Sequence, residues 1–337
     1  MKRTILLSVV LLILGLVSWP ARTGAHAPTL PPTPTPTGPQ LGPGAHPDIP
    51  PGYTLIEGDI LVRTSFVKEH QLNPQATWTA NLWPNGVVPY EFDANVTQAN
   101  RTAMLQAMTD WQNVAAVSFV ARTNQADYIH IQDSSGNNSP VGRQGGQQIV
   151  NIFNWNVEFI MAHELGHTLG YWHEQSRPDR DNFVQINIGN VQAGQEHNFD
   201  KHCDAAQYGP YDFDSVMHYG QCDFDIFTDC LITHTTILVK APNQSWQTLI
   251  GQRNHLSYMD RTTMSFLYPQ ANWRFVEGSR PAGNGGFFSP WNNWGTAIAG
   301  TPTGGTLWIQ PGSYAAVGTY SRRMTLRAPL GGVHLGQ

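Results

Sequence analysis

The sequence has few cysteines and few charged residues, and both shortages narrow what the protein can be. Three cysteines in 337 residues, Cys203, Cys222 and Cys230, are too few for the dense disulfide framework of a small secreted scaffold. Charged residues make up 13% of the chain and the formal net charge is -5. There is neither a basic surplus that would suit nucleic acid nor a long acidic tail. We therefore expect no nucleic-acid partner.

Long apolar runs are also lacking, apart from one near the start of the chain. Lys2 and Arg3 precede an apolar run at residues 5–17, and Ala25-His26-Ala27 follows. This order of charged, apolar and small residues predicts a signal peptide at residues 1–27 and a secreted, extracellular protein. An uncleaved anchor is the alternative, but the run is shorter than the roughly 20 residues of a spanning helix. We expect no membrane anchor after signal cleavage.

The cysteine pairing is open at this stage. An exported chain can oxidise its thiols, and three cysteines allow three alternative single bridges with one thiol left over. A bridge between Cys203 and Cys222 is preferred because it would clamp the segment between them. Three reduced cysteines are the alternative.

Composition divides the remaining chain into four parts. Residues 28–51 form a proline-rich linker, residues 52–76 a candidate pro-segment, residues 77–270 a compact mixed domain and residues 271–337 a β-rich C-terminal segment. Within the mixed domain, hydrophobic periodicity predicts strands and helices. The strands are expected at Val87–Phe92, in "ADYIHIQDS" and in "QQIVNIF"; the helices at 97–113, at 157–169 and in "LSYMDRTTMSFLY".

The C-terminal segment has short alternating runs broken by glycine and proline, as in "GGTLWIQPGSYAAVG". It resembles the opening coils of a right-handed parallel β-helix. One or two coils alone bury little core, so either the segment docks on the main domain or it is a different small β module. It is a candidate for binding a cell-surface or glycan target, although Trp291, Trp294 and Trp308 are more typical of a small β core.

The stretch "HELGHTLGYWHEQSRPDRD" carries the strongest chemical signal. His163 and His167 are four residues apart, so on a helix they face the same way and can share one metal ion. On a continuing helix His173 would lie roughly 15 Å along the axis from His163, too far for the same ion. A left-handed glycine at Gly170 can end the helix and turn the chain back, which brings the third histidine to the metal.

The spacing H-E-x-x-H-x-x-G-x-x-H is the metzincin signature, and "YDFDSVMHYG" supplies the expected methionine turn at Met217. With "SVMHY", "VGRQGGQQIVNI" and "LSYMDRTTMSFLY", the motif resembles the astacin family of zinc endopeptidases from about Trp78 to Pro269. The resemblance implies an α+β, metzincin-like two-lobed zinc protease domain. Its upper lobe would hold a twisted sheet and the active-site helix, and its irregular lower lobe would hold a C-terminal helix.

The resemblance also implies roles for individual residues. His163, His167 and His173 would bind one catalytic Zn²⁺, and Glu164 would be the general base. Tyr219 would be a further zinc ligand at rest that swings away to hydrogen-bond the oxyanion, or else a packed aromatic. Met217 would form the floor beneath the metal, and Glu174 would anchor the mature N-terminus. A substrate-binding edge strand is expected at Gln148, Ile149, Val150 and Asn151. The alternative is that these residues form an ordinary interior strand.

The motif "IEGDI" resembles the zinc switch of the family's pro-segments, with Asp59 as the candidate ligand and Ile56 in place of the usual phenylalanine. A simple Gly-Asp turn is the alternative. The family's usual cysteines are absent, since Asn137 stands where one is common and "NIFNWNVEF" contains none. This departure leaves loop shapes and specificity open but does not affect the metal ligands.

The sequence therefore predicts a secreted endopeptidase that uses a zinc-activated water with Glu164 as general base. We expect it to be made as a latent precursor and to act on protein or peptide substrates. The alternative is a zinc-stabilised extracellular binding or adhesion protein with little proteolytic activity. All three ligands and the base are present, which favours the enzyme.

Overall fold

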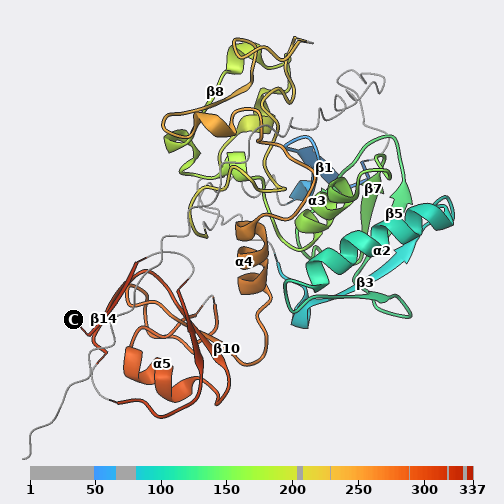
Figure 1. The fold of residues 1–337 in the computed structure, drawn as a ribbon. Helices are drawn as coiled ribbons and strands as arrows, with labels where there is room; N and C mark the ends of the chain where they lie inside the picture. The colour runs from blue at the N-terminus through green and yellow to red at the C-terminus, as the bar shows by residue number, and fades with distance from the viewer. Residues whose placement is uncertain are drawn as a thin grey trace, which may run out of the picture. The chain divides into compact units, whose positions relative to one another are not determined.

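The computed structural model describes residues 49–65, 81–202, 208–227, 229–287, 289–316, 319–328 and 332–336. The expected signal peptide, nearly all of the proline-rich linker, Trp78 and Cys203 lie outside these residues. Among the described residues, no helix is both long and apolar enough to cross a membrane. Mixed helices and sheets confirm the expected α+β class (Figure 1).

A four-stranded parallel sheet forms the first part of the fold. Its order is β4-β3-β5-β7, and the strands are β4 (Ser118–Ala121), β3 (Val87–Phe92), β5 (Tyr128–Asp133) and β7 (Gln147–Ile152). The three strands expected from the sequence are confirmed. β3 and β5 supply the fully buried side chains Val88, Ile129 and Ile131 to the core.

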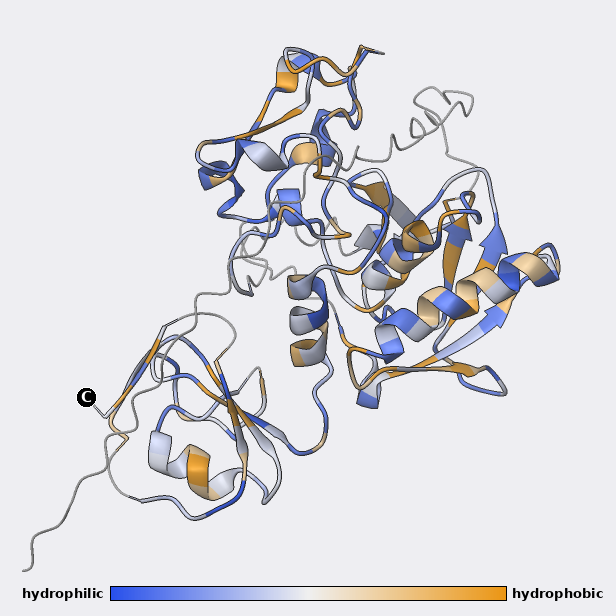
Figure 2. Ribbon diagram, in the orientation of Figure 1, coloured by the Kyte–Doolittle hydropathy of each residue, from blue (hydrophilic) through white to orange (hydrophobic). Residues whose placement is uncertain are grey.

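Helices α2 (Gln98–Gln112) and α3 (Glu158–Thr168) complete this part. The Thr97 side chain caps α2 by accepting a hydrogen bond from the Asn100 amide. Hydrophilic and hydrophobic residues alternate along α2 (Figure 2), and Met104, Met108 and Trp111 are its large buried side chains. The Trp111 indole donates to the Ala162 carbonyl at 2.9 Å, which joins α2 to α3.

The second part of the fold is irregular and has its own buried cluster. Short helical turns and a two-stranded antiparallel ribbon surround Phe199, Tyr211, Phe213 and Ile237. Its elements are η2 (Glu174–Ser176), η3 (Arg180–Asn182), β8 (Val184–Ile186), η4 (Ile188–Asn190), η5 (Glu196–Phe199), β9 (Ile237–Val239) and η6 (Gln244–Trp246). Helix α4 (Tyr258–Leu267) follows, and Ser257 and Asp260 form its capping box.

The disulfide joins Cys222 to Cys230, with Cα atoms 5.7 Å apart. The preferred pairing of Cys203 with Cys222 is therefore wrong. The bridged cysteines are only eight residues apart in sequence, and the loop between them brings them to bonding distance, which spacing alone could not reveal. Cys203 lies outside the described residues.

The candidate pro-segment forms a β-hairpin. β1 (Tyr53–Ile56) pairs antiparallel with β2 (Ile60–Arg63), and β2 pairs in parallel with the short strand β6 (Ser139–Pro140). Before β3 lies the turn η1 (Pro84–Gly86). A shared three-stranded sheet thus joins the three-residue turn of the hairpin, Glu57-Gly58-Asp59, to the main domain.

The C-terminal segment consists mainly of parallel strands, as expected for coils of a β-helix. β10 (Trp273–Val276), β11 (Thr306–Ile309) and β13 (Thr325–Arg327) stack in one sheet, and β12 (Gly312–Tyr314) pairs with β14 (Val333–Leu335). Helix α5 (Trp294–Gly300) covers them. Trp294 and Trp308 are buried, as expected for core residues. The ring of Phe266 in α4 packs against the rings of Phe275 and Trp308.

Candidate metal centre and active site

Helix α3 holds the first two histidines of the motif. Its residues Met161, Leu165 and the following Leu169 are fully buried in the sheet core, which fixes the rotation of the helix about its axis. His163 and His167 consequently project together from the opposite side. Both imidazoles are buried, at 2% and 0% exposure.

Gly170 ends α3 in the manner expected from the sequence. Its φ is 115°, a conformation that favours glycine. The Gly170 amide donates to the His167 carbonyl at 2.8 Å and the Tyr171 amide donates to the Gly166 carbonyl at 3.0 Å. These bonds close the last helical turn and redirect the chain. His173 then approaches the other two imidazoles from beyond the end of the helix.

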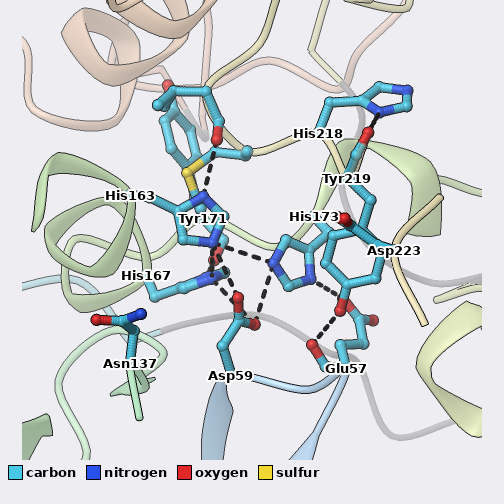
Figure 3. Close-up of polar contacts among 12 residues, drawn as sticks. Glu57, Asp59, Asn137, His163, His167, Tyr171, His173, His218, Tyr219 and Asp223 are labelled. Carbon is cyan, nitrogen blue, oxygen red and sulfur yellow. Dashed lines mark hydrogen bonds and ion pairs between the residues drawn. The ribbon is translucent and has the colours of Figure 1, made fainter. Parts of the chain in front are cut away.

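The three imidazoles converge on one point (Figure 3). The Nε2 atom of His163 lies 3.1 Å from that of His167 and 3.3 Å from that of His173. Tetrahedral zinc with nitrogen bonds of about 2.0–2.1 Å separates its ligand nitrogens by about 3.3 Å. The observed spacing fits one zinc ion held by the three Nε2 atoms.

Asp59 supplies a fourth group at the same point. One carboxylate oxygen lies 3.1 Å from Nε2 of His163, and the other lies 3.1 Å from Nε2 of His173 and 3.6 Å from that of His167. The four side chains form the one group of mostly buried potential ligands in the described part of the chain. Three nitrogens and one oxygen complete a four-coordinate zinc set.

The Nδ1 atom of each histidine is engaged on the side away from this point. His163 Nδ1 donates to the Val216 carbonyl and His167 Nδ1 to the Tyr171 carbonyl, both at 2.8 Å. His173 Nδ1 donates to the Glu57 carboxylate at 2.6 Å. Such partners fix the tautomer and leave Nε2 free for the metal.

Burial and the neighbouring carboxylates set the protonation of the imidazoles. Burial lowers the pKa of His163 to about 3 and also lowers the pKa of His167, so both favour the neutral form that binds metal. Burial acts the same way on His173, but the charges and hydrogen bonds of Asp59 and Glu57 outweigh it and raise that pKa to about 9. A bound divalent cation would balance the negative charge of these two carboxylates.

Glu164 lies beside the histidines and is 1% exposed. Its Oε2 atom is buried and has no hydrogen-bond partner among the described residues. Burial, and then the charge of Asp59, raise the pKa of this carboxyl well above its usual range. A buried, unpaired carboxyl next to three convergent imidazoles is available to hold a proton.

Met217 lies beneath the helix, where a methionine turn is expected. Its sulfur lies 2.7 Å from the position that a Cβ atom on Gly166 would occupy. The turn is fixed by Asp260 of α4, whose carboxylate accepts from the Val216 amide at 2.8 Å and from the Ser215 hydroxyl at 2.6 Å. Helix α4 thus holds the floor of the site in place.

Tyr219 follows the turn and is buried beside His173, with their ring centroids 4.5 Å apart. Its hydroxyl donates to the backbone carbonyl of Glu57. Burial raises the pKa of the phenol well above its usual range, so the hydroxyl keeps its proton. In this structure the phenol therefore serves as a donor to the hairpin turn.

The other expected site residues have defined surroundings. Glu174 is half-buried, and its carboxylate accepts from the Asp212 amide at 2.8 Å and from Arg177 at 3.1 Å. Residues 66–80, which contain the expected mature N-terminus, lie outside the described part of the chain. The roles expected for Glu174 and for the zinc ligands stay predictions.

The expected substrate-binding strand lies in β7, the last strand of the four-stranded sheet. On its outer side, the Asn151 amide and carbonyl already form two hydrogen bonds with Asn138, at 2.9 and 3.1 Å. The neighbouring β6, not β7, pairs with the hairpin strand β2. β7 thus lies at the end of the four-stranded sheet with one outer bridge, at Asn151, and the substrate role of Gln148, Ile149, Val150 and Asn151 stays a prediction.

Sequence reasoning missed three residues that shape the site. Glu57 contacts His173 and His202 with its carboxylate, Asp260 holds the methionine turn, and Gly166 admits the Met217 sulfur. The capping pattern Ser257-x-x-Asp260 was a local signal for one of them. Glu57 stands in "IEGDI" two residues before Asp59, but its partners are distant in sequence.

Comparison with known proteins gives a match to one family. The model of the Astacin peptidase family matches residues 75–269. The chain is 40% identical over 199 residues to Tolloid-like protein 2 of Mus musculus, covering 56% of this chain and 19% of that protein. The chain thus spans about a fifth of the length of this relative.

A second relative is covered more completely. High choriolytic enzyme 1 of Oryzias latipes is 34% identical over 222 residues, which is 64% of this chain and 77% of the relative. The solved structure of this hatching enzyme, a zinc-protease, superposes with a TM-score of 0.50 at 34% identity, covering 56% of this chain and 92% of that one. The likeness fits the expected two-lobed metzincin fold.

Proposed function

This chain belongs to the astacin family of zinc metalloendopeptidases, and we propose that it is a secreted endopeptidase made as a latent precursor. The observation that carries the proposal is the convergence of three Nε2 atoms, 3.1 and 3.3 Å apart, beside a buried and unpaired glutamate. The family uses one catalytic zinc ion. When bound, zinc would polarise a peptide carbonyl and acidify a water molecule.

The ligands and the base would divide the chemistry between them. His163, His167 and His173 would hold the ion as neutral imidazoles, which leaves its positive charge intact. Glu164 would accept the proton of the attacking water and deliver it to the leaving amine. Its burial and its lack of a hydrogen-bond partner among the described residues support this role.

Tyr219 would stabilise the oxyanion by donating its hydroxyl, after serving as a further zinc ligand at rest. Its position against the His173 ring supports a role next to the reacting carbonyl. A phenol that keeps its proton is a suitable donor, since developing negative charge is stabilised by preorganised donors. In the precursor this hydroxyl is directed to the Glu57 carbonyl instead.

Latency would come from the hairpin turn. Asp59 lies within 3.6 Å of all three Nε2 atoms, where its carboxylate would exclude substrate and water from the metal. The pairing of β2 with β6 holds the turn there, and the Ser139 amide donates to the Asp59 carbonyl at 2.9 Å. Cleavage before about Trp78 would release the segment, and Glu174 would then anchor the new N-terminus.

Substrate recognition would use backbone pairing at the edge that the hairpin occupies. An extended peptide gains affinity by adding a strand to an exposed edge. The pairing of β2 with Ser139 and Pro140 supports β6 as that edge, with Gln148, Ile149, Val150 and Asn151 of β7 behind it. The substrates would be proteins or peptides, and residues 271–337 would bind a cell-surface or glycan target.

The domain division proposed for the full chain follows the sequence. Residues 1–27 would be removed as a signal peptide, residues 28–51 would be a linker and residues 52–76 the pro-segment. Residues 77–270 would form the peptidase domain and residues 271–337 the C-terminal module. The family match at residues 75–269 supports the extent of the peptidase domain.

Cleavage of casein by the purified, activated protein tests the proposal. A zinc chelator should abolish cleavage, and added zinc should restore it. Glu164→Gln should reduce the rate by about 10²–10⁴-fold while leaving zinc content unchanged. Glu196→Gln, at an exposed glutamate, is the matched control and should retain full activity. A zinc-loaded, activated protein that cleaves no member of a broad peptide library would overturn the proposal.

A further inference from the structure

We propose that Glu57 is a second inhibitory residue of the pro-segment, which holds the third zinc ligand and Tyr219 in the precursor while Asp59 faces the metal. This inference rests on the proposed latency and extends it. Glu57 is two residues before Asp59 in the same hairpin turn. Among the described residues, its carboxylate contacts His173 and His202 of the peptidase domain.

The backbone of Glu57 adopts a conformation that glutamate rarely takes. Its φ is 46°, and the flanking pair Ile56 and Ile60 closes the turn. Left-handed backbone is disfavoured for residues with a Cβ atom, and glycine or asparagine is the usual choice there. Strained residues of this kind persist where surrounding contacts over-determine them. The side chain of Glu57 provides such contacts.

The carboxylate of Glu57 is buried between two histidines of the peptidase domain. The side chain is 1% exposed; one oxygen accepts from His173 Nδ1 at 2.6 Å and the other pairs with His202 Nε2. An ionised, buried carboxylate is stable here only while both partners are present.

The backbone carbonyl of Glu57 engages a third group, since it accepts the hydroxyl of Tyr219. One residue therefore contacts both the imidazole of His173 and the phenol proposed to stabilise the oxyanion (Figure 3). Asp59 covers the remaining face at the Nε2 atoms. The turn thus sets the Asp59 carboxylate against the three Nε2 atoms, while Glu57 contacts His173 with its carboxylate and Tyr219 with its backbone carbonyl.

Gly58, between the two acidic residues, lets the turn fit. A Cβ atom on Gly58 would lie 2.4 Å from the ring of Phe224, and its φ is 73°. The turn is therefore in van der Waals contact with the loop that the Cys222–Cys230 bridge closes. This close approach lets the Glu57 and Asp59 carboxylates reach the histidines at the same time.

The experiment compares full-length precursors carrying Glu57→Ala, Glu57→Gln or Ser65→Ala. The last is an exposed pro-segment position and serves as the control. Initial rates on a fluorogenic peptide are measured before maturation, followed by the rate after complete maturation. Because the pro-segment is removed, every mature product has the same sequence, so differences must arise in the precursor.

Glu57→Ala should raise the precursor's rate by about 10- to 100-fold, since each lost hydrogen bond to a charged group shifts the balance toward the open hairpin. Glu57→Gln keeps an acceptor for His173 and should give a smaller rise. Ser65→Ala should match the wild type. In an inactive Glu164→Gln background, hydrogen exchange at the Ser139 amide should accelerate in Glu57→Ala, because this amide reports docking of the hairpin.

The outcomes separate this inference from the proposed function. The inference alone would be overturned if the mature enzyme is active but the Glu57 variants behave as the wild-type precursor does. That is, their precursors would show the same low peptide-cleavage rate and the same protection of the Ser139 amide from hydrogen exchange. Accelerated exchange with unchanged rates would assign Glu57 to hairpin stability, which also overturns it. A mature enzyme without activity would overturn the proposed function, whatever the exchange shows.

Discussion

The sulfur of Met217 occupies the space that a side chain on Gly166 would fill, at 2.7 Å from the position of its Cβ atom. Gly166 lies on α3 between the two histidines of the motif. The glycine in "HELGH" is therefore needed for close packing of the methionine turn against the helix. Loss of this contact would change the floor of the site without altering a ligand.

Gly166→Ala should destabilise the protein by about 1–2 kcal/mol, because the added methyl group must displace the Met217 side chain. The rate of peptide cleavage should fall with it. Thermal unfolding and initial rates measure the two effects. Gly189→Ala is the matched control, since a Cβ atom there meets nothing within 4 Å. Equal behaviour of the two variants would contradict the packing role.

Gly170→Ala tests the turn that delivers the third ligand. Alanine at a φ of 115° is strained by about 1–2 kcal/mol, and the chain can relieve that strain by moving His173 away. Zinc affinity is measured by competition with a chelator. It should fall by about tenfold for each 1.4 kcal/mol of strain that is relieved by displacing His173. Gly194→Ala, with a φ of 85° in open space, should lose stability but retain zinc affinity.

The three-histidine metal site could be predicted from the sequence because the residues that define it lie close together along the chain. His163, His167 and Gly170 lie within eight residues, and helix geometry alone dictates which of them face together. Strands β3, β5 and β7 and helices α2, α3 and α4 were predicted for the same reason, since their hydrophobic patterns are local and regular. The positions of His173 and Met217 followed from the family's motif.

The contacts that complete the site could not be predicted, because they join distant segments. Glu57 and His173 are 116 residues apart, and nothing in either neighbourhood signals the other. β6 has two residues, too few for a periodicity, so its pairing with the hairpin strand β2 could not be predicted. The disulfide likewise depended on which cysteines the fold brings together.

The Cys222–Cys230 bridge should stabilise the irregular lobe. Closing a loop of about nine residues removes unfolded-state entropy worth about 2–3 kcal/mol. The double variant Cys222→Ser with Cys230→Ser should lower the unfolding free energy by about that amount. Cys203→Ser should leave the bridge intact, which peptide mapping under non-reducing conditions can detect. A Cys203–Cys222 peptide would refute the pairing.

Asp59→Asn should activate the uncleaved precursor. The amide lacks the negative charge of the carboxylate, and it binds zinc less well than a carboxylate does. Initial rates on a peptide substrate should rise by at least about tenfold before any processing is visible on a gel. Precursor that remains silent with asparagine at this position would show that the aspartate does not maintain latency.

Stability should depend on pH through Asp110. Burial, and then Glu158 of α3, raise its pKa to about 6, so the folded state binds this proton more tightly than the unfolded state. The unfolding free energy contributed by this group is therefore highest below about pH 4 and declines as pH rises to about 6. Asp110→Asn should raise the melting temperature at about pH 8 and leave it unchanged at about pH 4. Asp200→Asn, at an exposed position, should show no such difference between the two pH values.

Cleavage would not affect the hydrogen bonds at the three Nδ1 atoms equally. Two of the acceptors are backbone carbonyls of the peptidase domain, and they persist after cleavage. The third acceptor is the carboxylate of Glu57, which would depart with the proposed pro-segment. A carboxylate partner makes an imidazole a stronger base and a better ligand. If the proposed latency holds, zinc would therefore be bound more tightly before cleavage, while His173 still has its carboxylate partner.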